Sequence, residues 1–476
     1  MEKSLNTADE AAEPKQAAKP VTRPFLAMLG MLIGGFVGML SETSLNIALP
    51  TLMTQLHVNI GTIQWLVTGY MLIIGIVLPL SSLLSRIFST RQIILFALID
   101  FMVGAAISAL APSFGMLLIG RMIQGIATGL ILPLMFTVAT LIFPPYKLGS
   151  AMGMIGLVIM FAPAIGPTLA GMILGILSWQ WIFWLFVPFL LIGFFLAFKY
   201  LPNVGTITKP KIDSFSILLS TLGFGGLVTG VSLASDSGWT SPSVLGTLVV
   251  AVILLGWYIH RQVKSATPIL NFKVFANKQF RTGAILVMLD FGIILSSMYL
   301  LPMFWQNGLA IPVALTGIVM LPGGIVNAIV SAIAGRSSDT VSPRLLTTLG
   351  FGITIIGIIA LLFATSTSPV WYVIMAHIIM MVGVPLSMSP AQTFGLGALD
   401  QRTSSDGSTI MNTFQQIVGA IATAIATSLL AFGQQLSSTA SHQVAFTTGV
   451  HVGLIFPLVF AILALSLSLT IKENHA

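Results

Sequence analysis

The stretch GGFVGMLSETSLNIALP, residues 34–50, places a glutamate, Glu42, toward the end of an apolar segment that begins at about residue 25. A segment of roughly 20 apolar residues is long enough to cross the hydrocarbon core of a bilayer as a helix. A carboxylate within such a helix is costly, and it usually faces a bundle interior or a water-filled cavity. Gly38 and Asn46 lie four residues on either side of Glu42 and share its helix face, which is therefore small and polar. The stretch predicts a membrane helix with a functional carboxylate.

The rest of the chain predicts an all-α, polytopic membrane protein. Of its 476 residues, 56% are hydrophobic and only 7% are charged, against about 25% charged in soluble domains. The chain has no cysteine, which excludes disulfides and Cys-ligated metals. We expect fourteen spans, at about residues 25–47, 62–84, 92–111, 115–140, 150–173, 180–198, 214–234, 243–260, 282–306, 313–334, 346–364, 369–391, 408–430 and 449–470.

The basic residues predict the orientation of these spans. With fourteen spans, 19 of the 20 Lys and Arg residues fall in the two termini and the six loops on their side, and none falls in the seven opposite loops. Cytoplasmic loops carry the excess of Lys and Arg, so both termini are expected in the cytoplasm of a multi-pass protein of the cell membrane. Residues 1–24 are expected to be a disordered tail, and residues 472–476 a second tail. The net charge of +7 is then an orientation signal and predicts no nucleic-acid partner.

Four ionisable residues with fixed charges fall well inside the predicted spans: Glu42, Asp100, Arg121 and Asp290. Burial favours the neutral form of a carboxyl group and a nearby cation favours its ionised form, so Glu42 is a candidate proton carrier. Arg121 is expected at a similar depth, where it can pair with Glu42 and either tune a proton site or lock two helices together. Asp290 is a second candidate protonation site, whereas Asp100 is more typical of a buried structural partner.

A segment of small residues and prolines, MFAPAIGPTLAGMIL, occupies residues 160–174. Pro163 and Pro167 lie four residues apart, and Ala162, Gly166 and Ala170 form one ridge. Small ridges let two helices approach closely, and proline bends a helix and frees carbonyl groups. The segment predicts a tightly packed, bent membrane helix.

These segments together resemble the major facilitator superfamily, in its fourteen-span drug/proton antiporter branch, which includes lincomycin-type exporters. The similar motifs are LSETSLNIALP in the first span, LIGRMIQGIATG with Arg121, Gln124 and Gly125, APAIGPTLAG with Pro163, Gly166, Pro167 and Gly171, and GRSSDTVSPR with Gly335, Asp339 and Arg344. The third of these motifs marks exporters within the superfamily. The resemblance covers most of the chain, from about residue 25 to residue 470.

The chain departs from this family pattern at three places, one of which is Gln180, which replaces the usual arginine of the sixth-helix signature. The acid of the family's first-helix motif aligns with Ser41, while the carboxylate here is Glu42, a rotation of about 100° round the helix. In the first copy of the loop signature, SSLLSRIFSTRQ, residues 81–92, serines replace the glycine (Ser81) and the acid (Ser85). The resemblance therefore implies an acidic latch in the second half only, although Arg86 and Arg91 remain as basic residues of a cytoplasmic gating loop.

The resemblance implies a major facilitator fold. Residues 25–200 would form one six-helix bundle, residues 201–265 two inserted helices, and residues 266–471 a second six-helix bundle. The protein would be a monomer in the lipid bilayer, without enzymatic activity, cofactor or metal.

The resemblance also implies a proton-coupled exporter of lipophilic or amphipathic drugs, powered by the proton gradient through alternating access. Glu42, Arg121 and Asp290 are its candidate coupling residues, with Asn46, Asp100 and Gln124 in a second tier. The aromatic residues expected in the substrate cavity are Trp65, Tyr70, Phe291 and Tyr299.

Three other functions remain open from the sequence. The first is export or flipping of a dedicated native substrate, such as a lipid, fatty acid, bile salt or siderophore, with drugs incidental. The second is uniport or import, and the third is a membrane enzyme or a structural subunit of a respiratory complex. An ATP-driven pump is excluded because the chain has no GxxxxGK[ST] motif.

Overall fold

The computed structural model describes residues 23–471, except for residues 59, 205–206, 209–212, 266–267, 401–402 and 438–440. The predicted tails therefore lie outside the described residues, apart from Arg23 and Pro24, and so does the basic residue Arg402. Within the described residues the chain is helical and has no strand.

Within the described residues, fourteen helices are long and apolar enough to cross a membrane, which confirms the predicted number of spans. They are α1 (Pro24–Leu56), α2 (Ile60–Ile87), α3 (Thr90–Ala109), α4 (Phe114–Ile142), α5 (Leu148–Ile176), α6 (Gln180–Tyr200), α7 (Ser214–Ser237), α8 (Pro242–Lys264), α9 (Lys278–Met303), α10 (Val313–Ser337), α11 (Pro343–Leu362), α12 (Val370–Gly397), α13 (Ser404–Leu436) and α14 (His442–Ser468).

Local sequence signals explain where several of these helices begin. Ser89 caps α3 by accepting a hydrogen bond from the backbone of Gln92, whose side chain accepts one from the backbone of Ser89. This reciprocal pair satisfies two backbone donors that a helix start leaves free. Proline occupies the first turn of α1, α8 and α11, where its missing N–H group costs nothing.

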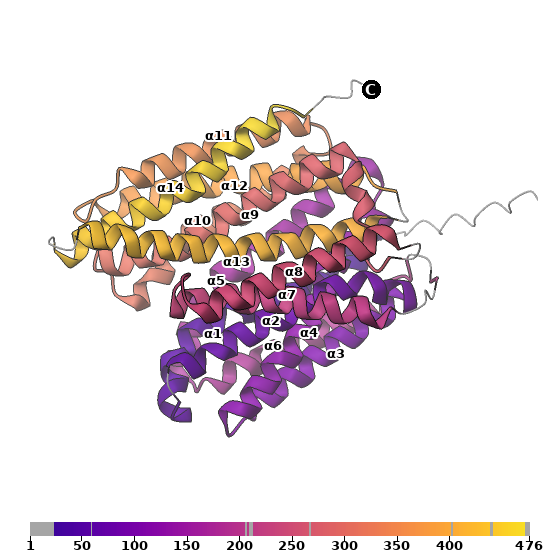
Figure 1. Ribbon diagram of the computed structural model, residues 1–476, viewed down its shortest axis with the longest axis horizontal. Helices are drawn as coiled ribbons and strands as arrows, with labels where there is room; N and C mark the ends of the chain where they lie inside the picture. The colour runs from indigo at the N-terminus through magenta and orange to yellow at the C-terminus, as the bar shows by residue number, and fades with distance from the viewer. Residues whose placement is uncertain are drawn as a thin grey trace, which may run out of the picture.

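The helices form two bundles. Figure 1 shows α1 to α6 on one side and α9 to α14 on the other, with α7 and α8 alongside the junction. Helix α7 contacts α2 of the first bundle and α13 of the second, and it pairs with α8. The inserted helices therefore flank the junction between the bundles.

An ion pair joins the start of α7 to the last turn of α8. Arg261 on α8 donates to both carboxylate oxygens of Asp213, which also caps the start of α7. The Arg261 guanidinium lowers the pKa of Asp213 to about 2, so this carboxylate is ionised throughout the physiological range.

The helix ends that carry the basic loops form what we call the basic side of the molecule. There α5 crosses α10 so closely that their backbones approach each other at three glycines. A Cβ atom added to Gly335 would lie 2.6 Å from the carbonyl oxygen of Gly149 and 2.7 Å from the backbone nitrogen of Gly153. Glycine at these positions permits the two bundles to meet backbone to backbone.

Candidate functional site

Glu42 lies on α1 with one carboxylate oxygen, Oε2, buried and without a hydrogen-bond partner among the described residues. The expected direct pair with Arg121 is not formed: the ion pairs within the described residues are Arg86–Asp406 and Arg261–Asp213. Glu42 and Arg121 are nevertheless close enough to interact electrostatically. The carboxylate is thus near a cation without being bound by it.

Arg121 is fully buried on α4 and is held by neutral groups. Its guanidinium donates to the hydroxyl of Ser41 at 2.5 Å, to the side-chain oxygen of Gln124 at 2.9 Å and to the backbone oxygen of Leu66 at 3.3 Å. It also lies over the ring of Tyr70, 4.0 Å from the ring centre. These contacts link α4 to α1 and α2, and both predicted roles of Arg121, tuning a proton site or locking helices, stay predictions.

Tyr70 extends the same polar cluster. Its hydroxyl donates to the backbone oxygen of Gly38 at 2.9 Å and lies 2.7 Å from the hydroxyl of Thr128. A side chain at Gly38 would collide with Thr128, because an added Cβ atom would lie 2.7 Å from its Oγ1. The small residue at position 38 therefore lets α1 and α4 close around the cluster.

The segment of α5 that resembles the antiporter motif packs on the turn of α1 that carries Glu42. A Cβ atom on Gly166 would collide with the hydroxyl of Thr43 and would lie 3.1 Å from the backbone oxygen of Leu40. Pro163 is also buried, whereas Gly171 has no atom within 4 Å of the position that a Cβ would take. Of Pro167 only the backbone is described. Gly166 is thus the member of the motif that makes the close contact.

The other two carboxylates in the spans lie elsewhere. Asp290 is fully buried on α9, where its Oδ2 accepts a hydrogen bond of 2.6 Å from Ser387 on α12, and its Oδ1 has no partner among the described residues. Asp100 is half-buried on α3, with Oδ2 also unpaired within the described chain. Asn46 is exposed on α1.

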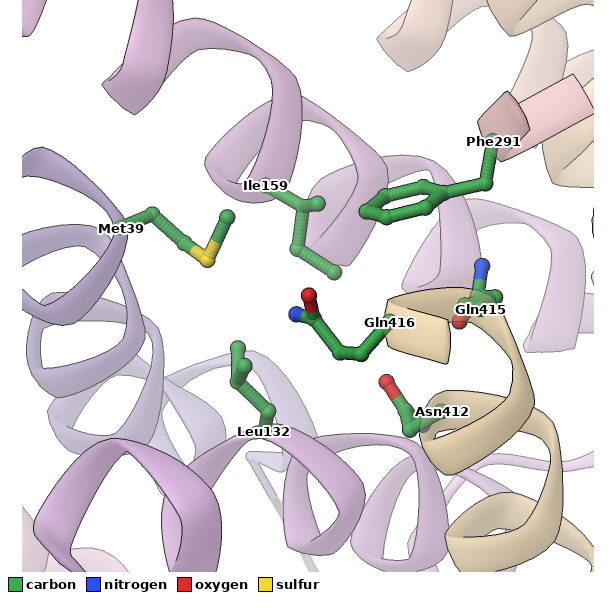
Figure 2. Close-up of a pocket in the computed structure, with 7 residues that line it drawn as sticks. All are labelled: Met39, Leu132, Ile159, Phe291, Asn412, Gln415 and Gln416. Atoms are coloured by element: carbon green, nitrogen blue, oxygen red, sulfur yellow. The ribbon is translucent and has the colours of Figure 1, made fainter. Parts of the chain in front are cut away.

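A small pocket, with room for about one water molecule, lies between the two bundles (Figure 2). Met39 belongs to this lining and lies three residues before Glu42, on the same face of α1. The coupling candidate is therefore about one helical turn from the pocket. The lining residues are Met39, Leu132 and Ile159 from the first bundle and Phe291, Asn412, Gln415 and Gln416 from the second.

The four aromatic residues expected in the cavity have different surroundings. Phe291 lines the pocket. Tyr70 lies inside the first bundle beneath Arg121 and is outside this pocket. Trp65 is 40% exposed on α2, and Tyr299 is half-buried on α9, two turns beyond Phe291.

At the basic side, the predicted second-half acid bridges the two bundles. Asp339 follows α10 and accepts hydrogen bonds from the backbone N–H groups of Gly149 at 2.7 Å and Ser150 at 3.1 Å, and from the Ser150 hydroxyl. These N–H groups belong to the first turn of α5, where the helix leaves donors free and favours negative charge. We call this contact the Asp339 latch.

The first-half loop has no acid at Ser85, but its arginine pairs with an acid from the opposite bundle. The acid is Asp406, in the first turn of α13, and Arg86 donates to its two oxygens at 2.7 and 2.6 Å. Ser82 also donates to Asp406, and Ser85 lies 3.0 Å from the hydroxyl of Ser405. We call this contact the Asp406 latch. Its cation, Arg86, belongs to the first bundle, and its acid, Asp406, belongs to the second.

Asp406 was not predicted from the sequence, because it lies 320 residues from Arg86 and outside the loop signature. The signal was the carboxylate in SSDGSTIMN, at the start of a predicted span, and the arginine left without an acid in its own loop. The other gating candidates lie apart from the latches. Arg91 donates to the backbone oxygen of Phe198 inside the first bundle, and Arg344 is exposed.

The chain is similar to known proteins in sequence and in fold. The family model of the Major Facilitator Superfamily matches residues 31–423 of the chain. The lincomycin resistance protein LmrB of Listeria monocytogenes is 44% identical over 462 residues, which cover 95% of this chain and 97% of the relative. LmrB of Bacillus subtilis is 45% identical over 448 residues, covering 92% and 94%. The human organic anion transporter MFSD10 has a similar fold, with a TM-score of 0.65 at 15% identity over 92% of this chain and 99% of that one.

Proposed function

Because the chain belongs to the Major Facilitator Superfamily, a family of membrane transporters, we propose that it exports amphipathic drugs in exchange for protons. Support for drug export comes from the two relatives at 44% and 45% identity, whose names state lincomycin resistance. The observation that carries proton coupling is the unpaired buried oxygen of Glu42, on the turn of α1 that Gly166 contacts.

In this proposal the basic side faces the cytoplasm, so both termini are cytoplasmic and the protein lies in the cell membrane. The Asp339 and Asp406 latches hold the bundles together on that side. The structure then corresponds to the state in which the pocket is closed toward the cytoplasm. Opening both latches while the opposite side closes would expose the pocket to the cytoplasm, as alternating access requires.

Glu42 would carry the proton. It is close enough to Arg121 to interact with it, yet it makes no direct bond that would hold it ionised. It would take a proton from outside and release it to the cytoplasm after the bundles rock, while the substrate leaves in the opposite direction. Met39 would connect proton transfer at Glu42 with movement of the substrate, since it lines the pocket three residues before Glu42.

The proton gradient suffices as the energy source, without a cofactor. Moving one charge across 100 mV provides about 2.3 kcal/mol, and each tenfold concentration ratio requires about 1.4 kcal/mol. One electrogenic proton would therefore sustain roughly a 50-fold gradient of a neutral substrate. The protein would act as a monomer.

The test is pH-driven uptake of fluorescent drugs and lincosamides into inverted vesicles, for the wild type, Glu42→Gln and Asp100→Asn. We expect Glu42→Gln to abolish the dependence of transport on the pH gradient. Asp100→Asn is the matched control, because it also removes a carboxylate that has an unpaired buried oxygen but lies on α3, away from the pocket. Coupled transport that survives in Glu42→Gln would refute the role of Glu42.

A further inference from the structure

The pocket between the bundles has two chemically different walls. Its four apolar residues come from α1, α4, α5 and α9, whereas its three polar residues are all carboxamides from α13. Those carboxamides are Asn412, Gln415 and Gln416, and Figure 2 shows the amide of Gln416 reaching toward Met39 and Ile159. No residue that lines this pocket carries a charge.

The carboxamides have hydrogen-bonding capacity that the protein leaves unused. The Nδ2 of Asn412 donates to the backbone oxygen of Ser408 at 2.9 Å, and its side-chain oxygen points into the pocket in Figure 2. The Nε2 of Gln415 is buried without a partner among the described residues. A buried polar group without a partner is costly, so a ligand that supplies the missing bond is favoured.

An amide both donates and accepts hydrogen bonds, as a hydroxyl group does, and it carries no charge. A cluster of amides therefore matches a substrate region with several hydroxyl or amide groups. A permanent organic cation would lose its hydration in this pocket and find no carboxylate there in exchange. Two carboxylates lie near the lining without belonging to it: Glu42 is about one helical turn beyond Met39, and Asp290 accepts a hydrogen bond from Ser387 through Oδ2.

We propose that Asn412, Gln415 and Gln416 determine substrate specificity, selecting uncharged amphiphiles with neighbouring hydroxyl or amide groups over permanent cations. The apolar part of such a molecule would lie against Met39, Leu132 and Phe291. Met39 adapts to different shapes because its side chain is flexible and polarisable. This inference rests on the proposed function in taking the pocket as the transport site.

The test uses two probes that share one fluorophore, the first bearing a glucosyl group and the second a trimethylammonium group. Their binding to the purified full-length protein in lipid nanodiscs is measured first, because binding requires neither transport nor proton coupling. We expect the wild type to bind the glucosyl probe about tenfold more tightly or better, the scale of one or two hydrogen bonds. Equal binding of both probes, tighter binding of the cation or no binding of either would overturn the inference.

Three variants assign the selectivity to the carboxamides. Gln416→Leu should weaken binding of the glucosyl probe by roughly five- to tenfold, and Gln416→Glu should strengthen binding of the cationic probe, a gain that an unfolded protein cannot produce. Gln392→Leu is the matched control, since it removes a fully buried carboxamide from α12 that does not line the pocket. An unchanged ratio of the two probes in both Gln416 variants would contradict the assignment.

Transport of the same probes separates this inference from the proposed function. Selective binding with transport that ignores the pH gradient would leave the specificity intact and refute proton coupling. Proton-coupled export that favours the cationic probe would leave proton coupling intact and refute the proposed specificity.

Discussion

At the scale of single residues, the decisive feature is the position of the acid on α1. Ser41 occupies the position of the family acid and bonds directly to the guanidinium of Arg121. A carboxylate at that position would be in direct contact with a buried cation, which strongly favours its ionised form. Glu42, one residue on, has an oxygen with no partner among the described residues. We infer that the shift releases the acid from the arginine that locks the helices.

Moving the acid back tests this interpretation. In the double variant Ser41→Asp with Glu42→Gln, the new carboxylate can contact Arg121 directly, so protonating it requires a higher proton concentration. We expect the pH dependence of export to move to more acidic values by roughly one to three units, the usual effect of an adjacent arginine. The pH profile of uptake in inverted vesicles measures this shift, with Ser41→Asn in the Glu42→Gln background as the control. A profile identical to that of the wild type would contradict it.

At the scale of helices, two kinds of contact hold helices and bundles together. Glycine contacts bring α5 against α1 at Gly166 and against α10 at Gly149 and Gly153. Charged contacts, the Asp339 and Asp406 latches, tie the ends of α5 and α13 to the opposite bundle. Helix α5 therefore contacts both the turn of α1 that carries Glu42 and the Asp339 latch.

Two glycines of α5, Gly166 and Gly171, should respond differently in stability and export rate when each is changed to alanine. Gly166→Ala forces a methyl group into Thr43 and the backbone of α1, an overpacking that typically costs about 1–3 kcal/mol. Gly171→Ala meets no atom and gains helix propensity, worth up to about 1 kcal/mol. We expect Gly166→Ala to lower both the unfolding temperature and the export rate, and Gly171→Ala to lower neither. Thermal unfolding of the purified variants and vesicle uptake check this, and equal behaviour of the two would count against the contact.

The Asp406 latch can be tested by labelling, because the chain has no native cysteine. Thr137→Cys places a thiol where α4 meets α13, next to Ser408. In that background Asp406→Asn should raise maleimide labelling by about tenfold. Losing roughly 1.4 kcal/mol of stability from the closed state raises the ratio of open to closed molecules about tenfold. Arg344→Gln removes an exposed arginine on the same side and should change nothing.

Exchanging the two charges of this latch provides the reverse test. Arg86→Glu combined with Asp406→Arg should return labelling toward the wild-type level, because the ion pair is restored in the opposite sense. Labelling that stays high in the exchanged variant would show that the contact depends on more than its charges.

At the scale of the whole molecule, the fold could be predicted from the sequence because its determinants are local. The length of each apolar segment and the side on which the basic residues gather determined the fourteen spans, and the helices confirm them. The site was less predictable, because its contacts join distant segments. Arg86 and Asp406 are separated by 320 residues, and Ser41 and Arg121 by 80. Spacing along one helix could not indicate that Arg121 would bond to Ser41 while Glu42 stays unpaired.

The most direct test of the central claim is the exchange of a proton for substrate at Glu42. Purified protein in weakly buffered detergent is mixed with a transported drug, and the released protons are counted with a pH indicator. We predict that drug binding releases protons from the wild type and from Asp100→Asn, but none from Glu42→Gln. Proton release that is undiminished in Glu42→Gln, with drug binding intact, would contradict the account.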